Sequence, residues 1–334
     1  MKTITVIFSA SVLLLSSLLS AASGTMPDRS IPVPVRMGTI LYVGGSGPGN
    51  YTRIQDAVDN ASAGDTVFVY DGSYSESLKV NTSLVLLAED QQVIIDVRFL
   101  YAPAVVVLTD AVTVEGFTIL DYQTELGKAS IMVLADDCRI LGNLISSMGT
   151  GDSGIGLIGA EGAIVKNNII THQTFGVSLV NASHNIIAND TITEDVEGMS
   201  LYDSNDNVVE NCTISNDANG VLLFDACRNT IRGNTIWRCS YDGVSLDYLS
   251  TGSSDNVITG NSFVGNGRDS AFVVKTGRNT FDRNYWHRYL SRPKLIVGGR
   301  IVYTLPGVPF HFPGLNIVIP WVAVDWHPLK TPGW

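Results

Sequence analysis

The sequence predicts an all-β solenoid in which short parallel strands stack coil upon coil. Three observations carry this prediction: glycines recur at a fixed spacing, apolar pairs recur in register with them, and asparagines recur between the apolar runs. The glycines are 22 residues apart, at Gly154, Gly176, Gly198 and Gly220, and Gly243 follows 23 residues later. A fixed period of this length is typical of repeat proteins, whose units share one continuous core.

Each repeat contains short β-branched runs and no helical pattern. In the repeat that begins at Gly198, Met199 and Leu201 alternate with polar residues, and Val209 and Ile214 form the next apolar pair. Asn, Asp and Gly separate these runs, which is typical of strands joined by turns. One repeat cannot bury its apolar face alone, so the repeats must stack.

Asparagine forms columns in register with the apolar pairs. The chain has 22 Asn, and 18 of them lie between Asn143 and Asn284. The first column is Asn185, Asn207, Asn229, Asn256 and Asn279; the second is Asn143, Asn168, Asp190, Cys212, Asn234, Asn261 and Asn284. Across a strand spacing of about 4.8 Å, stacked amides can hydrogen-bond to one another. We therefore expect amide ladders, because Asn-rich surface loops would not keep this register.

These repeats resemble those of the pectin-lyase-like superfamily, and in particular the NosD-type group of secreted and periplasmic proteins. The upstream segments TRIQDAVDNASAGDTVFVYDGSYSESLKVNTSLVLLAEDQQVIID and AVTVEGFTI are similar to the N-terminal segment of that group. The resemblance implies a single-stranded right-handed parallel β-helix with a short N-terminal capping helix and a C-terminal cap. Its motifs are specific for the fold and say little about activity.

The expected organisation is one elongated domain with covered ends. We predict a signal peptide at 1–22, a flexible lead-in at 23–37, an N-terminal cap with the first coils at 38–102, β-helix repeats at 103–286 and a C-terminal cap at 287–334. In the N-terminal cap, Ile54, Ala57 and Val58 mark the apolar face of a short helix. A cover is needed because an open coil end exposes unpaired strand edges.

The N-terminus predicts secretion. Lys2 is followed by an apolar segment from Ile4 to Leu19 and then by small residues, which is typical of a secretory signal cleaved after Ala22. An uncleaved membrane anchor is the alternative, since the segment approaches the length needed to span a bilayer. We therefore expect an extracellular or cell-surface location. The formal net charge of −11 argues against nucleic acid as a partner, because nucleic-acid binding needs clustered Lys and Arg.

Secretion raises the questions of glycosylation and disulfides. The sequons at Asn50, Asn60, Asn81 and Asn181 are the candidate glycosylation sites. The four cysteines, Cys138, Cys212, Cys227 and Cys239, fall on different coils, so we expect them to be free and mostly buried. Cys212 and Cys239 are the pair with the least separation to bridge.

An acidic column is the first candidate site. Asp203 and Asp225 occupy the same turn position in adjacent coils, and Asp247 lies one place earlier in the next. Carboxylates at strand spacing suit acid–base chemistry on a glycan, and they also suit Ca²⁺. Asp195 and Asp217 form a weaker candidate set for Ca²⁺. The alternative interpretation is a solvated turn, in which Asp is favoured for its backbone geometry.

Aromatic residues near the turns are candidates for carbohydrate binding. They are Tyr202, Phe224, Tyr241 and Tyr248. Aromatic rings can pack against sugar rings, although the same residues can simply cover a strand edge. Two insertions, 121–130 and 247–256, interrupt the period, and insertions in repeat proteins often border a binding face.

Other chemistries have less support. The five His are scattered and form no His-x-His motif or Met cluster of the kind that copper sites use. The sequence therefore favours a non-catalytic scaffold or carbohydrate-binding module whose partner is a polysaccharide or cell-surface glycan. The alternative is a polysaccharide lyase or glycoside hydrolase that uses the Asp-lined face. A weaker alternative is an accessory protein in copper maturation. No cofactor is expected apart from a possible Ca²⁺.

Overall fold

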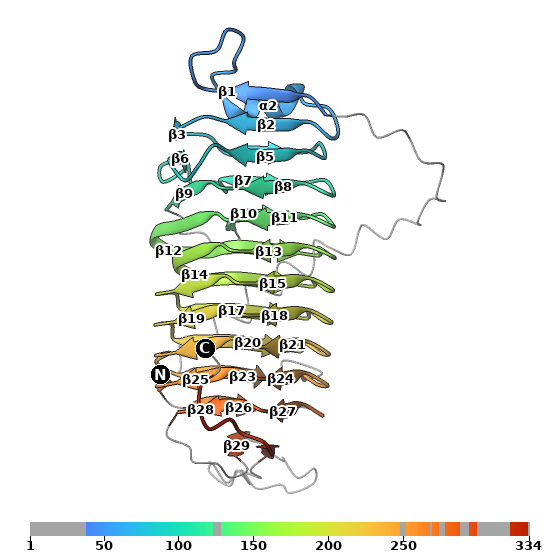
Figure 1. The fold of residues 1–334 in the computed structure, drawn as a ribbon, viewed down its shortest axis with the longest axis vertical. Coiled ribbons are helices and arrows are strands. Elements are labelled where there is room, and N and C mark those ends of the chain that lie inside the picture. Colours follow the sequence, from blue (N-terminus) through green and yellow to red (C-terminus); the bar gives the residue numbers. More distant parts are fainter. Residues whose placement is uncertain are drawn as a thin grey trace, which may run out of the picture.

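The computed structural model describes residues 38–122, 128–247, 252–267, 269–273, 278–287, 294–298 and 321–332. The chain forms a right-handed parallel β-helix of about 10 turns, which confirms the predicted fold class. The coils stack along the long axis of the molecule, with β1 (Ile40–Val43) and α2 (Ile54–Asn60) at one end and β29 (Lys294–Gly298) at the other (Figure 1).

The described strands fall into three parallel columns, two of which join through long bent strands. The first column contains, in spatial order, β1, β2 (Thr66–Val69), β5 (Val85–Ala88), β8 (Thr113–Glu115), β11 (Arg139–Leu141), β13 (Ile164–Lys166), β15 (Ile186–Ala188), β18 (Val208–Glu210), β21 (Thr230–Arg232), β24 (Val257–Thr259), β27 (Thr280–Asp282), β30 (Trp321–Asp325) and β29. Only the last pair among these, β29 with β30, is antiparallel.

The second and third columns share β12 (Leu144–Ile158) and β14 (Ile169–Val180). The second also contains β3 (Gly72–Tyr74), β6 (Val93–Asp96), β9 (Thr118–Asp121), β16 (Thr191–Thr193), β19 (Thr213–Ser215), β22 (Thr235–Trp237), β25 (Ser262–Val264) and β28 (Tyr285–Trp286). The third also contains β4 (Leu78–Val80), β7 (Val105–Val107), β10 (Ala129–Val133), β17 (Glu197–Tyr202), β20 (Asn219–Phe224), β23 (Asp242–Asp247) and β26 (Asp269–Val273).

The sequence period becomes the strand register. Ile170, Ile192, Ile214 and Ile236 pair one above the other in the second column, and each is fully buried. Residues one coil apart therefore share the same environment. This is why a single 22-residue pattern can describe several coils.

The period glycines are needed because neighbouring coils approach too closely for a side chain. A β-carbon on Gly198 would lie 2.5 Å from Ile214 Cγ2 and 2.7 Å from both Asp217 Oδ2 and the Gly220 carbonyl oxygen. Gly176 meets the equivalent atoms of the coil that follows it. The glycine column thus marks the place in the third strand column where each coil approaches the next one too closely for a side chain.

Both predicted amide ladders are present and buried. In the first, Asn207 Nδ2 donates to Asn229 Oδ1 at 3.1 Å and to the Ala182 carbonyl at 3.0 Å, while Asn207 Oδ1 accepts from the backbone N–H of Asn185 at 2.9 Å. The second ladder has the same pattern except at Asp190 and Cys212, and it ends on Asp325 Oδ2, which accepts from Asn284 Nδ2 at 3.1 Å. The ladder side chains hydrogen-bond to backbone N–H and C=O groups at the turns that the strands do not pair.

A helix covers the N-terminal end of the described solenoid, and aromatic rings stack near its other end. At the N-terminal end, α2 buries Ile54, Ala57 and Val58, the three residues that the sequence assigned to its apolar face. At the other end, Trp286 stacks on Phe263 with ring centroids 4.5 Å apart. The four cysteines are free, as predicted, and only Cys227 is not buried.

The predicted signal peptide and lead-in, residues 1–37, lie outside the described residues, as does most of the predicted C-terminal cap. In the part of the chain that is described, no helix is both long and apolar enough to cross a membrane.

Candidate functional site

The Asp column lies at the turn that follows the third strand column. Asp203 has a φ of 46° and Asp225 a φ of 48°, and Asn181 occupies the same place one coil earlier with a φ of 49°. Asn and Asp tolerate this left-handed conformation because their short polar side chains bond locally. The strand register pairs Phe224 with Asp247, so Asp247 lies one place before the Asp203–Asp225 column, as the sequence indicated.

Two aromatic rings stand beside these carboxyl groups. Tyr202 and Phe224 end adjacent strands, their ring centroids are 6.3 Å apart, and their planes are tilted by 44°. Both side chains are partly exposed. We refer to Tyr202, Asp203, Phe224, Asp225 and Asp247 as the acidic corner. It combines apolar ring faces with hydrogen-bonding oxygens on neighbouring coils.

The carboxyl groups of the acidic corner differ in exposure. Asp203 is exposed, and its pKa is raised by partial desolvation and by the nearby charge of Asp225. Asp225 is 5% exposed, and its Oδ1 accepts a hydrogen bond from the backbone N–H of Gly252 at 2.6 Å. Asp225 therefore holds the 247–256 insertion at Gly252, and Asp203 is the more accessible carboxyl group.

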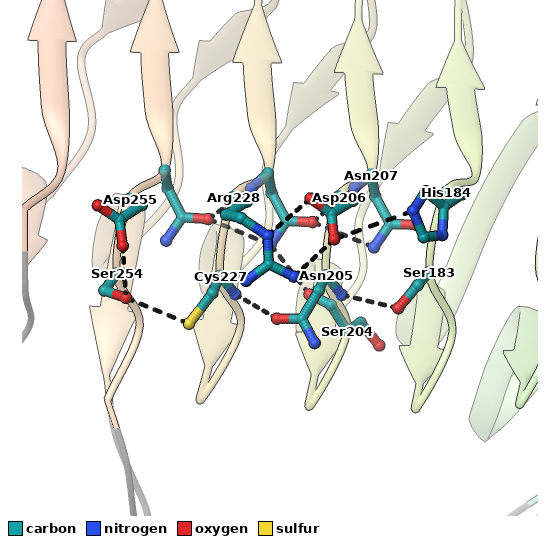
Figure 2. A network of polar contacts seen from close by, with 12 residues as sticks. Ser183, His184, Ser204, Asn205, Asp206, Asn207, Cys227, Arg228, Ser254 and Asp255 are labelled. Atoms are coloured by element: carbon teal, nitrogen blue, oxygen red, sulfur yellow. Dashed lines mark hydrogen bonds and ion pairs between the residues drawn. The ribbon is translucent and has the colours of Figure 1, made fainter.

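A polar network continues the turn on the side of β18. Figure 2 shows Arg228 reaching across to Asp206 on the preceding coil. Arg228 Nε donates to Asp206 Oδ1 at 2.8 Å and Nη2 donates to Oδ2 at 2.6 Å. These hydrogen bonds lower the pKa of Asp206. His184 and Asp255 occupy the flanking coils, so basic and acidic side chains alternate along this ridge, in contrast to the acidic corner.

Uncharged side chains tie the same turns together (Figure 2). Asn205 Oδ1 accepts from the backbone N–H of Cys227 at 2.8 Å, and the Asn205 N–H donates to Ser183 Oγ at 3.2 Å. On the next coil, Ser254 Oγ donates to Cys227 Sγ at 3.4 Å. These bonds link four successive coils, so the turn beside the acidic corner is held firmly in place.

Of the other two predicted aromatic residues, only Tyr241 lies in the described part of the chain, and it is not part of this group. Tyr241 is 50% exposed and precedes β23, at the end of the strand column opposite to Tyr202 and Phe224. Tyr248 lies outside the described residues. Of the predicted glycosylation sites, Asn60, Asn81 and Asn181 are exposed, and Asn50 is partly exposed.

Asp195 and Asp217 point into the solenoid instead of towards solvent. Asp195 Oδ1 accepts from the Gln173 N–H at 2.6 Å, and Asp217 Oδ1 accepts from the Asp195 N–H at 2.9 Å. Their Oδ2 atoms are buried and have no hydrogen-bond partner among the described residues. Burial raises the pKa of Asp195 to about 9 and that of Asp217 to about 8, with smaller contributions from neighbouring acids.

Two more buried acids were not singled out as site candidates from the sequence. Burial raises the pKa of Glu197 to about 7 and that of Asp190 to about 7. Strongly shifted pKa values gather at functional sites, and structural networks produce them as well. The signal that could have found Asp190 was in the sequence, because it replaces Asn in a ladder column. Glu197 had no such signal.

The described residues contain no group of three or more His, Cys, Asp or Glu side chains that could hold a metal ion. Calcium needs six to eight oxygen ligands, and half of each interior carboxyl group already accepts a backbone hydrogen bond. Thiolates bind Cu⁺, but burial raises the pKa of both Cys212 and Cys239 to about 12, so these thiols keep their protons. These residues do not fit a copper site.

Comparisons with known proteins agree with this fold. Residues 58–302 match the family model described as periplasmic copper-binding protein (NosD). A comparison with curated proteins finds no match.

Several solved structures share the fold at low sequence identity. The enzymatically active domain of bacteriophage CBA120 tailspike protein 2 is 11% identical with a TM-score of 0.54, over 71% of this chain and 41% of that chain. Pectin methylesterase from Aspergillus niger is 15% identical with a TM-score of 0.50, over 70% and 85%. XylC in complex with xylose is 10% identical with a TM-score of 0.51, over 72% and 70%. The chain thus spans less than half of the tailspike domain. Likenesses at this identity concern the fold alone.

Proposed function

This chain belongs to the NosD family of periplasmic copper-binding proteins, and from that premise we propose that it is an extracytoplasmic scaffold that binds a polysaccharide without cleaving it. The observation that carries the proposal is the pairing of Tyr202 and Phe224 with the carboxyl groups of the acidic corner. Ring faces pack against the apolar faces of sugars, and carboxylates accept hydrogen bonds from sugar hydroxyls.

The geometry favours an extended ligand over a single sugar. Tyr202 and Phe224 lie on adjacent coils, so their rings follow the solenoid axis, and Asp247 continues the same column on the next coil. A chain of sugars can contact several coils in succession. The proposed ligand is neutral, because a protein with a net charge of −11 repels an acidic polymer unless cations bridge the two.

The first test is a glycan array probed with the intact protein, with and without Ca²⁺. We expect binding to neutral polysaccharides in both conditions. For a glycan identified in this way, Tyr202→Ala and Phe224→Ala are each expected to weaken binding about tenfold, because a lost stacking contact is worth about 1 kcal/mol or slightly more.

Tyr42→Ala is the matched control. Tyr42 is also a partly exposed ring, stacked on Tyr70 with centroids 5.9 Å apart, but it lies at the N-terminal end of the solenoid. Its replacement should leave glycan binding unchanged. If Tyr42→Ala weakens binding as much as Tyr202→Ala does, the acidic corner is not the binding site. Absence of binding to any glycan would favour an inert scaffold.

A second candidate function is glycan cleavage. The specific observation in its favour is the raised pKa of Asp203 beside Asp225, because acid catalysis needs one of two neighbouring carboxyl groups to keep its proton. The test is the release of reducing or unsaturated ends from plant, algal or microbial polysaccharides. Cleavage that is abolished by Asp203→Asn would overturn the non-catalytic proposal. Asp225→Ala is less informative, because Asp225 also holds Gly252.

A role in copper maturation follows from the family name alone. The described thiol groups are spread over separate coils and do not fit a copper site. We expect the purified protein to lose added Cu⁺ and Cu²⁺ on dialysis against a weak chelator. Retention of one copper ion per chain, measured by elemental analysis, would restore this alternative.

A further inference from the structure

One step of the second amide ladder differs from every other described step. At most positions an Asn bonds to the next Asn, as Asn234 Nδ2 does to Asn261 Oδ1 at 3.0 Å. At one step the two places are taken by Asp190 and Cys212, so the step has no side-chain amide. The ladder resumes when the Cys212 N–H donates to Asn234 Oδ1 at 2.8 Å.

One oxygen of the Asp190 carboxyl group fits the hydrogen-bond pattern of the ladder, and the other does not. Its Oδ1 accepts from the Asn168 N–H at 2.7 Å and from Asn168 Nδ2 at 2.9 Å, as an amide oxygen would. Its Oδ2 is buried and has no hydrogen-bond partner among the described residues, and the residue as a whole is 1% exposed. An unpartnered polar atom at this depth is unusual in a folded protein.

The neighbouring asparagines show what is missing at this position. Asn168 Nδ2 donates to the Ile140 carbonyl at 3.0 Å, and Asn234 Nδ2 donates to the Val209 carbonyl at 3.0 Å. The register that pairs Ile140 with Val165 makes the Val165 carbonyl the equivalent acceptor for Asp190. An ionised carboxylate has only acceptors, whereas a protonated carboxyl group can donate one hydrogen bond.

We propose that Asp190 is a proton-dependent latch between its own coil and the preceding coil, which carries Asn168 and Val165. With a proton, Asp190 completes the ladder as an Asn would. Without the proton, the ladder holds a buried negative charge, and the two coils separate locally so that water can reach it. Asp190 exchanges this proton with water, so opening and closing the latch needs no other reactant.

The surroundings of Asp190 offer no compensating positive charge. The following coil presents the Cys212 thiol, which stays protonated because its pKa is raised to about 12 by burial and by Asp190 itself. The preceding coil presents the uncharged Asn168. No ion pair joins Asp190 to a Lys, Arg or His among the described residues. Burial outweighs the hydrogen bonds from Asn168 and the weaker backbone interaction with Ala188, and it raises the pKa of Asp190 to about 7.

The sign of the pH effect follows from this shift. In the closed coil Asp190 keeps its proton up to about pH 7, whereas in an opened coil it ionises near its ordinary value of about 3.9. Opening therefore becomes easier as pH rises between these two values, by about tenfold per pH unit, and the effect levels off above pH 7.

The experiment measures hydrogen-exchange protection of single backbone amides by NMR between pH 5 and 8.5, corrected for intrinsic exchange. The reporter is the Asn168 N–H, which bonds to Asp190, and the internal reference is the Asn234 N–H, which bonds to Asn261 in the same ladder. In the wild type, we expect Asn168 protection relative to Asn234 to fall about tenfold per pH unit up to about pH 7. In Asp190→Asn it should not change with pH.

Asp137→Asn is the matched control, because it removes one exposed carboxylate at a left-handed turn position without touching the ladder. It should behave as the wild type does. A wild-type protection ratio that stays constant from pH 5 to 8 overturns the proposal, and so does an unchanged slope in Asp190→Asn. If that variant does not fold, the wild-type ratio alone decides. None of these readouts depends on glycan binding.

Discussion

Glycine is required at the period positions Gly154, Gly176, Gly198 and Gly220 because the next coil passes too close for a β-carbon. The constraint acts between coils, through the Ile214 side chain, the Asp217 carboxyl group and the Gly220 backbone in the case of Gly198. Local turn chemistry plays no part in it. The regular glycine spacing that first indicates a repeat protein is therefore a consequence of tertiary packing, because the same close approach recurs once per coil.

Gly198→Ala tests this explanation. The added methyl group cannot be accommodated without moving the neighbouring backbone, so we expect a loss of about 2–4 kcal/mol in the free energy of unfolding, measured by denaturant titration. Gly156→Ala is the control, because its β-carbon would meet only Ala129 Cβ, at 3.0 Å. Equal losses in the two variants would contradict the close-approach explanation.

At the scale of single elements, the amide ladders and the final strand β30 connect neighbouring coils through side-chain hydrogen bonds, in addition to the backbone bonds between strands. A ladder asparagine such as Asn207 satisfies two backbone groups of the preceding coil and bonds to an asparagine side chain of the next, so the turn geometry of one coil depends on its neighbours. The last described ladder partner is a carboxylate: Asp325 in β30 closes the column below Asn284 and also accepts from Trp286. Elements far apart in sequence are thereby joined at the end of the stack.

Asn207→Ala should disrupt one rung of the first ladder. It leaves the Asn185 N–H and the Ala182 carbonyl buried without their partners, and we expect a loss of about 2–4 kcal/mol in stability. Thermal or denaturant unfolding measures this change. Asn60→Ala, at the exposed end of α2, should cost less than about 1 kcal/mol. A loss of that small size for Asn207→Ala would mean that water replaces the rung.

Asp325→Ala should loosen the C-terminal end of the described solenoid. Asp325 Oδ2 accepts three hydrogen bonds, from the Asn284 N–H at 3.0 Å, from Asn284 Nδ2 at 3.1 Å and from Trp286 Nε1 at 3.0 Å. We expect a loss of about 2–4 kcal/mol and faster hydrogen exchange at the Asn284 amide. Asp282→Ala is the control, because Asp282 pairs only with exposed side chains. Unchanged exchange at Asn284 would contradict this role.

For the molecule as a whole, the buried acids make stability depend on pH in a direction opposite to that of most proteins. The pKa values of Asp195, Asp217 and Glu197 are raised to about 9, 8 and 7. Each group keeps its proton in the folded chain at a pH where the unfolded chain has lost it. Their contribution to stability is therefore complete below about pH 4 and is lost as pH rises through the folded values.

We accordingly expect the free energy of unfolding to decrease from pH 5 to pH 9. The limiting slope for one group is about 1.4 kcal/mol per pH unit. Asp217→Asn should make the decrease shallower, because an amide does not ionise and Asn already occupies this column at Asn266. Denaturant unfolding at pH 5, 7 and 9 measures the slope. Stability that rises towards pH 8 would show that these groups are ionised in the folded chain.

The sequence by itself determined the solenoid, its register, the amide ladders and the turn position of Asp203 and Asp225. All of these follow from the 22-residue period, because the same spacing of glycines, apolar pairs and asparagines recurs in each coil. The single sequence therefore shows the same pattern several times. The 22-residue columns by themselves also place Cys212 in a ladder.

Only the tertiary structure decided what each side chain faces. It turned Asp195 and Asp217 into the interior, attached Asp225 to Gly252, and placed Tyr241 at the opposite end of the strand column from Tyr202. It also left one oxygen of Asp190 without a partner among the described residues. The physical reason is that the repeat period determines which residues stack on one another. Whether a stacked side chain is buried and what it bonds to depend on the three-dimensional path of each coil.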